Sequence, residues 1–191
     1  ELLLSNDAID CTKKATAIEE LNKKRRSIGQ QIQQDIQKQL TNSPDLTTAP
    51  SIVCSGQFWH MGVIGINASR LVDQYCKPAI VIGFDSDVAR GSARSVPGVN
   101  IYNILQKCAH TLTHFGGHSQ AAGFQLDPTN IQAFKDAFMT HSKSIPADSQ
   151  KRVIQLDAQL PLGRISLALI EELNKCEPFG EGNPRPTFYA N

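Results

Sequence analysis

The first forty residues carry apolar side chains with the period of an α-helix. These side chains recur every three or four positions, and glutamine and lysine fill much of the space between them. Asn6 or Asp7 can cap the first turn, so we expect one long helix from about residue 6 to residue 40. Arg25 falls within the stripe, where its guanidinium either extends to solvent or meets a buried carboxylate or phosphate. The stripe consists of Ile18, Leu21, Ile28, Ile32, Ile36 and Leu40.

Residues 41–51 form a turn-rich connector with two prolines. After it, short apolar runs typical of strands alternate with segments whose apolar residues have helical periodicity. This alternation predicts an α/β sheet with flanking helices. We expect strands at residues 51–58, 79–84, 89–96 and 121–126, and helices at residues 62–75, 100–112 and 128–142.

A second change of pattern falls at residues 144–152. After it we expect a strand at residues 153–160, a short helix at 167–175 and a rigid, turn-rich segment, "EPFGEGNPRPTF". This last part is too short for a stable domain, and the chain does not begin with methionine, so we expect a piece of a longer protein. The expected divisions are residues 1–48, 49–147 and 148–191.

Composition narrows the classes of function. The 191 residues carry a formal net charge of +1, so any anion-binding surface must be local. No apolar run approaches the ~20 residues of a membrane span and no signal peptide is visible, so we expect no membrane partner. Five cysteines without a CxxC pair argue against a zinc knuckle or disulfide scaffold and for a reducing cytoplasm.

The stretch "FWHMGVIGINASRL" (residues 58–71) predicts a strand that ends near His60 and a helix that begins at Gly62. Helix N-termini carry unpaired N–H groups and partial positive charge, which suit anions. Gly62 and Gly65 allow close backbone approach, and Arg70 lies two turns further on. The alternative is that the glycines only let the helix pack tightly on the sheet.

The stretch "ARGSARSVPG" (residues 89–98) places Arg90, Ser92 and Arg94 on one face of a strand, with Ser95 beside them. Two guanidiniums and a hydroxyl on one face form a candidate phosphate clamp, because the arginine fork matches phosphate oxygens. A solvated strand face is the alternative interpretation.

In "HTLTHFGGHSQAAGFQL" (residues 110–126), His110, His114 and His118 have the i, i+4, i+8 spacing of a helical metal site. Gly116 and Gly117 should end the helix before His118, and no nearby carboxylate accompanies the histidines, so we do not expect zinc. We expect His110 and His114 to be ordinary helix residues. The glycine pair and His118 then form a tight anion-binding loop, or merely a helix end before a packed strand.

No catalytic constellation accompanies these stretches, since Asp85, Asp87, Asp127 and Asp157 are scattered. From its residues alone, the chain is an anion-binding or nucleic-acid-binding α/β module. Trp59 and Phe115 are candidate residues for base stacking, although such aromatic side chains more often belong to a core.

A family resemblance sharpens this interpretation. Gly116-Gly117-His118-x-x-Ala121-Ala122-Gly123 resembles the signature of the DHHA1 domain, the substrate-binding partner of DHH phosphoesterases. With "WHMGVIGINASRL", "GSARS" and "PFGEGNPRPTF", most of the chain is similar to the RecJ family of single-strand-specific 5′ to 3′ DNA exonucleases. The resemblance implies a long interdomain connecting helix and linker (1–48), a DHHA1 substrate-binding domain (49–147) and the start of a truncated β-barrel domain of the oligonucleotide-binding (OB) type (148–191).

The resemblance also implies a division of labour. A DHH domain outside this chain would hydrolyse phosphodiester bonds with two Mn2+ or Mg2+ ions in DNA repair and recombination, and this chain alone would cleave nothing. Ser92 and Arg94 would hold the phosphate region at the 5′ end, Gly117 and His118 would face the scissile region, and His60 and Arg70 would line the groove. His118 is the candidate contact to the phosphate as charge builds up. Arg90, Ser95 and Gly116 complete the expected nucleic-acid-binding set.

Single-stranded DNA is the expected partner, and single-stranded-DNA-binding protein and recombination helicases are the candidate protein partners. Two other functions remain open. Short DHH–DHHA1 phosphoesterases that hydrolyse nano-oligonucleotides or phosphoadenosine phosphate share the Gly-Gly-His element, but they lack the PFGxGNP extension. A non-catalytic relative that serves as a replication scaffold is the other alternative.

Overall fold

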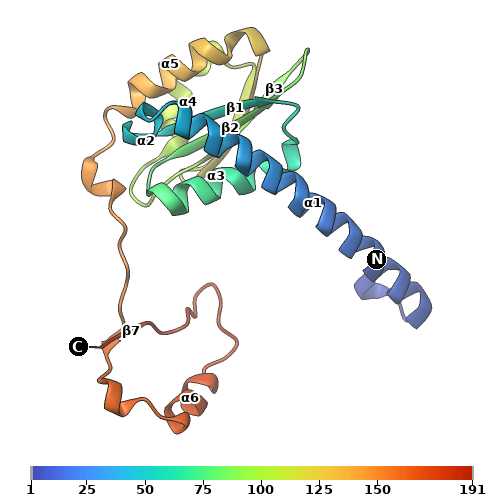
Figure 1. Ribbon diagram of the computed structural model, residues 1–191, viewed down its shortest axis with the longest axis vertical. Helices are drawn as coiled ribbons and strands as arrows, with labels where there is room; N and C mark the ends of the chain where they lie inside the picture. Colours follow the sequence, from blue (N-terminus) through green and yellow to red (C-terminus); the bar gives the residue numbers. More distant parts are fainter. Residues whose placement is uncertain (1, 191) are drawn as a thin grey trace. The chain divides into compact units, whose positions relative to one another are not determined.

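A computed structural model describes residues 2–190 of the chain, which divide into two compact units. The first unit, Glu1–Lys151, contains the long helix α1 (Ala8–Asn42) and a five-stranded sheet (Figure 1). The second unit, Arg152–Asn191, is smaller. No helix within residues 2–190 has both the length and the apolar content needed to cross a bilayer.

The sheet has the strand order β1-β2-β3-β5-β4. β1 and β2 are parallel and are joined through helix α3 (Met61–Tyr75), whereas all other neighbouring strands are antiparallel. The strands are β1 (Ile52–Gln57), β2 (Ala79–Phe84), β3 (Ala89–Arg94), β4 (His114–Gly117) and β5 (Ala121–Leu126).

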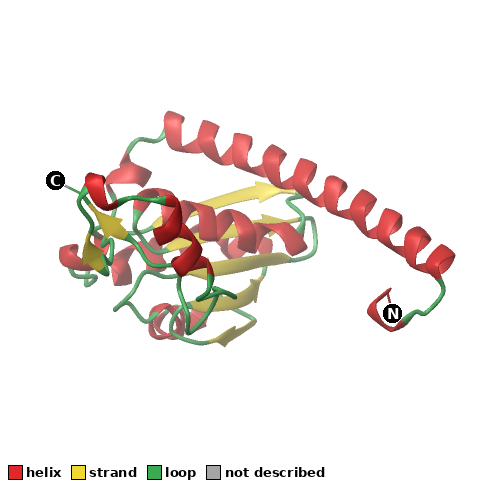
Figure 2. Ribbon diagram, turned by 90° about the horizontal axis from the view of Figure 1, so that it is seen from below, coloured by secondary structure: helices red, strands yellow, loops and turns green. Residues whose placement is uncertain are grey.

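Helices α1 and α3 cover one face of the sheet on the side of β1 and β2 (Figures 1 and 2). Their apolar side chains enclose Ile52, Cys54 and Val81 in one core cluster. Gly29 lets the two helices approach closely, since a Cβ atom there would lie 3.2 Å from Val63. The short helix α2 (Asp45–Thr48) then leads into β1.

The opposite face of the sheet packs against α4 (Ile101–Lys107) and α5 (Ile131–Ser142). Phe134 and Phe138 of α5 are fully buried, and the Phe124 ring of β5 stacks on Phe134 with centroids 4.6 Å apart. Phe124 also occupies the space in which a Cβ atom of Gly91 would lie. Single 3-10 turns occur at Leu2–Leu4, Ala109–Thr111, Pro128–Asn130 and Ala147–Gln150.

The long helix begins as predicted, with Asp7 accepting hydrogen bonds from the N–H groups of Ile9 and Asp10. Its apolar stripe, however, is buried only in the C-terminal half of the helix. Ile18 and Leu21 are exposed, and Arg25 is bound to the side chain of Asn22 instead of a buried carboxylate. The buried stripe residues are Ile32, Ile36 and Leu40.

The prediction of one helix over residues 100–112 was wrong in its second half. α4 ends at Lys107, His110 lies in the 3-10 turn Ala109–Thr111, and the backbone is extended again at Leu112. His114 therefore belongs to strand β4 and not to a helix, because this segment gains hydrogen bonds from pairing with β5. The other predicted strands and helices of this unit lie within a few residues of their expected bounds, whereas the short helix α2 falls in the segment predicted as a connector.

The second unit contains α6 (Leu167–Asn174), a 3-10 turn at Leu162–Arg164, and two short parallel strands. These strands are β6 (Ala158–Gln159) and β7 (Phe188–Tyr189), so the strand predicted at 153–160 is much shorter than expected. The turn-rich segment is held by Asn183, whose Nδ2 donates to the carbonyls of Cys176 and Pro178. None of the described residues of this unit is buried.

Candidate nucleic-acid interface

The face of the sheet that carries α3 stays uncovered by helices over part of β3 and over β5 and β4. Side chains alternate along each strand, and those on the other face of these strands, such as Ala93, Ala122 and Phe124, belong to the core beneath α4 and α5. The remaining positions are half-buried or exposed. We call them the open sheet face: Arg90, Ser92 and Arg94 of β3, Ala121, Gly123 and Gln125 of β5, and His114 and Gly116 of β4.

Strand pairing arranges the open sheet face in three rows that run across the strands. The far row is Arg90–Gln125–His114 and the middle row is Ser92–Gly123–Gly116. The near row is Arg94–Ala121, and His118 extends it because its N–H donates to the carbonyl of Ala121 at 2.8 Å. The middle row has almost no side-chain bulk, so a ligand can approach the backbone between two polar rows.

Arg94 lies against helix α3. Its Nη1 donates to the Ser92 hydroxyl and to the Ala93 carbonyl, both at 2.9 Å. A Cβ atom on Gly65 would lie 3.0 Å from Nη2 of Arg94 and 3.1 Å from Oγ of Ser92. Gly65 therefore leaves room for the guanidinium beside the helix, which is a more specific role than tight packing on the sheet.

Within residues 2–190, neither Arg90 nor Arg94 forms a salt bridge with a carboxylate. Asp85, at the end of β2, accepts hydrogen bonds from the N–H groups of Val88 and Asp87, which hold the pKa of its carboxyl below the usual range. The carboxylate of Asp85 also lies near enough to Arg90 for the guanidinium to contribute to lowering its pKa, but the two form no ion pair. This carboxylate stabilises the turn between β2 and β3.

The start of α3 lies beside the far row. His60 caps the helix, with Nδ1 accepting from the N–H of Gly62 at 3.1 Å. The backbone of Trp59 passes directly over Gly83, which pairs with Arg90 across the strands. Trp59 is buried, with its ring against Gly56, and therefore cannot stack on a base.

The Gly-Gly-His element is part of a β-hairpin and not a loop that follows a helix. Gly116 and Gly117 end strand β4, and residues 118–120 turn back into β5. Gly117 has φ 142°, and a Cβ atom there would lie 2.5 Å from the carbonyl oxygen of Ala121. The side chain of His118 is exposed at the tip of this hairpin. Phe115 points to the other face, 5.6 Å from the ring of Tyr102.

The structure brings most of the predicted site residues together. Arg90, Ser92, Arg94 and Gly116 share the open sheet face, with Gly117 and His118 at its edge and His60 at the start of α3. Ser95 lies elsewhere, because its buried hydroxyl donates to the Val99 carbonyl at 2.7 Å. Arg70 is exposed on α3 and makes no side-chain hydrogen bond to any described residue.

The small side chains of residues 121–123 predict a close approach of a partner to the backbone, and Gly123 lies in the middle row accordingly. Two members of the open sheet face, His114 and Gln125, are not predicted from the sequence. The period-two alternation of residues 121–126 is a usable signal for Gln125, since it falls on the polar side of β5. No comparable signal marked His114, because β4 has only four residues.

Sequence and structure comparisons decide the family. The family model for the DHHA1 domain matches residues 48–141, and the one for the RecJ OB domain matches residues 156–191. The single-stranded-DNA-specific exonuclease RecJ of Bacillus subtilis is 34% identical over 97% of this chain. The chain belongs to the RecJ family.

Solved RecJ structures agree with this assignment. RecJ from Thermus thermophilus in complex with Mn2+ matches 98% of this chain with a TM-score of 0.85 and 28% identity, over 27% of that protein. The same protein in complex with Mg2+ gives a TM-score of 0.80. The chain spans about a quarter of the Bacillus relative, 24% of its length, so most of that protein has no counterpart in this chain.

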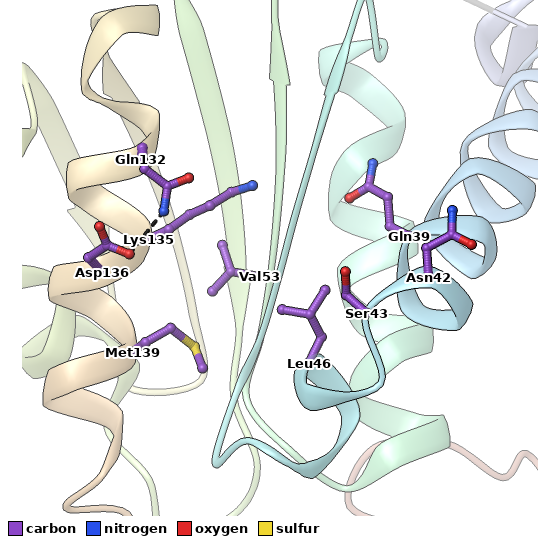
Figure 3. Close-up of a pocket in the computed structure, with 9 residues that line it drawn as sticks. All are labelled: Gln39, Asn42, Ser43, Leu46, Val53, Gln132, Lys135, Asp136 and Met139. Atoms are coloured by element: carbon purple, nitrogen blue, oxygen red, sulfur yellow. Dashed lines mark hydrogen bonds between the residues drawn. The ribbon is translucent and has the colours of Figure 1, made fainter.

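One pocket of about 430 Å3 lies away from the open sheet face, where β1 meets α1, α2 and α5 (Figure 3). Lys135 extends into it, and burial lowers the pKa of its ammonium group. Burial likewise raises the pKa of the nearby Cys54 thiol to about 11, so this cysteine is not a nucleophile at neutral pH. None of the residues predicted for phosphate binding lines this pocket.

Proposed function

We propose that this chain is the nucleic-acid-binding part of an exonuclease that acts on single-stranded DNA, as the names of its RecJ relatives say of those proteins. One observation carries the proposal. Two rows of polar side chains, including Arg90 and Arg94, which form no salt bridge with a described residue, flank a row with little side-chain bulk on one open sheet face. Arginine forks bind phosphate oxygens bidentately, and a bare backbone floor admits sugar and phosphate closely.

In this proposal Ser92 and Arg94 hold the phosphate region at the 5′ end of the strand. The hydrogen bond between them orients both groups before the strand binds, so little side-chain freedom is lost on binding. Gly117 and His118, at the hairpin edge, face the scissile region, where His118 can donate to a non-bridging oxygen. His60 and Arg70 line the path of the strand along α3.

We assign the two-metal hydrolysis to a DHH domain beyond this chain, which is supported by the Mn2+ and Mg2+ ions of the Thermus RecJ structures. Within residues 2–190, no three His, Cys, Asp or Glu side chains are grouped as metal ligands. The role of the present residues is to bind and orient the strand.

The same proposal gives each part of the chain a place in the longer protein. Residues 1–48 would connect the DHH domain to the DHHA1 domain of residues 49–147, and residues 148–191 would begin an OB-type domain. The exposed apolar side chains of the second unit, among them Val153 and Leu167, fit a segment that is completed by further strands. A role in DNA repair and recombination in the cytoplasm, beside single-stranded-DNA-binding protein and recombination helicases, belongs to this proposal.

Replacement of one guanidinium tests the proposal. In this chain or in a longer protein that contains it, Arg94→Ala should weaken binding of a 5′-phosphorylated oligothymidylate of about 12 nucleotides roughly 10- to 100-fold. The slope of log affinity against log salt should fall by about 1, because one phosphate contact is lost. Fluorescence anisotropy at several salt concentrations measures both quantities.

Arg25→Ala is the matched control, since Arg25 is an exposed arginine on α1 whose side chain binds only Asn22 among the described residues. Its affinity and salt slope should equal those of the wild type. An Arg94→Ala variant with unchanged affinity and unchanged salt slope would remove Arg94 from the interface. A preference of the longer protein for dinucleotides over the 12-mer would favour a nano-oligonucleotide phosphoesterase instead.

A further inference from the structure

The far row of the open sheet face carries three polar side chains on three neighbouring strands. Arg90, Gln125 and His114 lie directly opposite one another across β3, β5 and β4. Gln125 and His114 lie outside the arginine–serine and Gly-Gly-His motifs, and only strand register brings them beside Arg90. Arg90 and His114 are exposed, and Gln125 is half-buried.

All three side chains keep their donors available. Within residues 2–190, no hydrogen bond or salt bridge engages the guanidinium of Arg90, the amide of Gln125 or the imidazole of His114. The nearby hydroxyl of Thr113 donates to the backbone carbonyl of Gln125 and leaves its side chain uncommitted. The row is therefore a line of free donors, which suits oxygen acceptors of a bound molecule.

Distances along the sheet separate this row from the 5′-end contacts. Arg90 lies two residues before Ser92 on β3, which is about 7 Å at ~3.4 Å per residue, and the Arg94 guanidinium binds the Ser92 hydroxyl. The far row is therefore one row away from the groups that would hold the 5′ phosphate. A strand whose 5′ phosphate binds Ser92 and Arg94 reaches the far row only with the nucleotides that follow.

The far row is closed at one end. Trp59 lies over Gly83, the β2 partner of Arg90, so the row cannot continue toward β2. It continues from Arg90 toward β5 and the outer strand β4, where His114 is its last member. A strand that leaves the 5′-end contacts can therefore pass over Gly123 and Gly116 and meet this row next.

We propose that Arg90, Gln125 and His114 form a second contact line for the same single strand, which binds phosphate and sugar oxygens of the nucleotides that follow the 5′ end. The proposal rests on the proposed function and deepens it. Arg90 contacts a phosphate as a cation, whereas Gln125 contributes neutral hydrogen bonds. Binding of the nucleotides beyond the 5′ end then resides in this row, and binding of the 5′ phosphate resides in Ser92 and Arg94.

Two probes separate the rows: a 5′-phosphorylated oligothymidylate of about 12 nucleotides and thymidine 5′-monophosphate. Gln125→Ala and His114→Ala should each weaken binding of the long probe about three- to tenfold and leave binding of the mononucleotide unchanged. Gln125→Ala should keep the wild-type salt slope, whereas Arg90→Ala should lower it by about 1. Arg94→Ala should weaken binding of both probes.

Gln106→Ala and His110→Ala are matched controls, because these exposed residues lie on α4 and on the 3-10 turn that follows it. Both should bind like the wild type. Gln125→Glu keeps the shape of the side chain and adds a negative charge, so it should weaken long-probe binding more than Gln125→Ala does.

Wild-type binding of the long probe by Gln125→Ala, Gln125→Glu and His114→Ala would overturn the second contact line while the proposed function stands. An equal loss for both probes would also overturn it, because it would assign these side chains to the 5′-end contacts. Failure of the wild-type chain to bind either probe would instead refute the proposed function.

Discussion

At the residue scale, two neighbouring glycines have different roles. Gly117 has φ 142°, and a Cβ atom there would lie 2.5 Å from the Ala121 carbonyl and from Cα of Ala122. Gly116 has no such positive φ, and a Cβ atom there would meet nothing within 4 Å. Gly117 is therefore needed for the backbone conformation of the hairpin, whereas Gly116 leaves the middle row without a side chain at that position.

These environments predict opposite phenotypes for one added methyl group. Gly117→Ala should lower the free energy of unfolding by about 2–4 kcal/mol, through backbone strain and a clash with β5. Gly116→Ala should change stability by less than about 0.5 kcal/mol but weaken single-strand binding about fivefold, because the methyl group enters the middle row. Urea unfolding and anisotropy titrations of both variants measure these effects. Equal stability of the two variants would contradict the assignment.

Sequence alone placed Arg90, Ser92 and Arg94 on one face, because period two along a strand is a local property. It could not place Gln125 and His114 beside Arg90, because that requires the register of three strands that are distant in sequence. Trp59 shows the same limit. A tryptophan of the core and one that stacks on a base look the same in the sequence. Only the packing of the Trp59 ring against Gly56 shows that this side chain belongs to the core.

At the element scale, α1 consists of two physically different halves. From Gly29 onward it packs against α3 and β1, with Ile36 fully buried. The part before Gly29 buries no residue, and its ion pairs, such as Lys14–Asp10 at 2.6 Å, are local i,i+4 contacts. Helices of this length without tertiary contacts are marginal in water.

Amide hydrogen exchange of the isolated chain should reveal this division. We expect amides of residues 8–27 to exchange at least about 100-fold faster than those of residues 32–42, because opening of the first half breaks no core contact. Uniform slow exchange along α1 would contradict this expectation. In a longer protein the first half should become protected if it connects two domains, as proposed.

Helix and strand periodicity predicted the elements that carry continuous apolar patterns, such as α1, α3, β2 and β5. β4 was missed because its residues include two glycines and a histidine that also fits a helical spacing. Pairing with β5 overrides that local pattern. The hairpin therefore arises from tertiary contacts, which no single-sequence pattern contains.

At the scale of the whole molecule, the two units differ in how much structure their residues support. The first unit has two core clusters, one on each side of its sheet, whereas no described residue of the second unit is buried. Binding should therefore be a property of the first unit. This unit offers two separate candidate surfaces, the open sheet face and the pocket beside β1.

An NMR titration of the isotope-labelled chain with a 5′-phosphorylated oligothymidylate of about 12 nucleotides tests the central claim most directly. We predict amide shift changes concentrated in β3, β5 and β4, and at Gly62 and Gly65 of α3, because these backbone groups lie at or beside the open sheet face. Residues that line the pocket, including Gln39 and Lys135, should stay unperturbed. Perturbations confined to the pocket, or none at saturating oligonucleotide, would contradict the claim that the open sheet face binds single-stranded DNA.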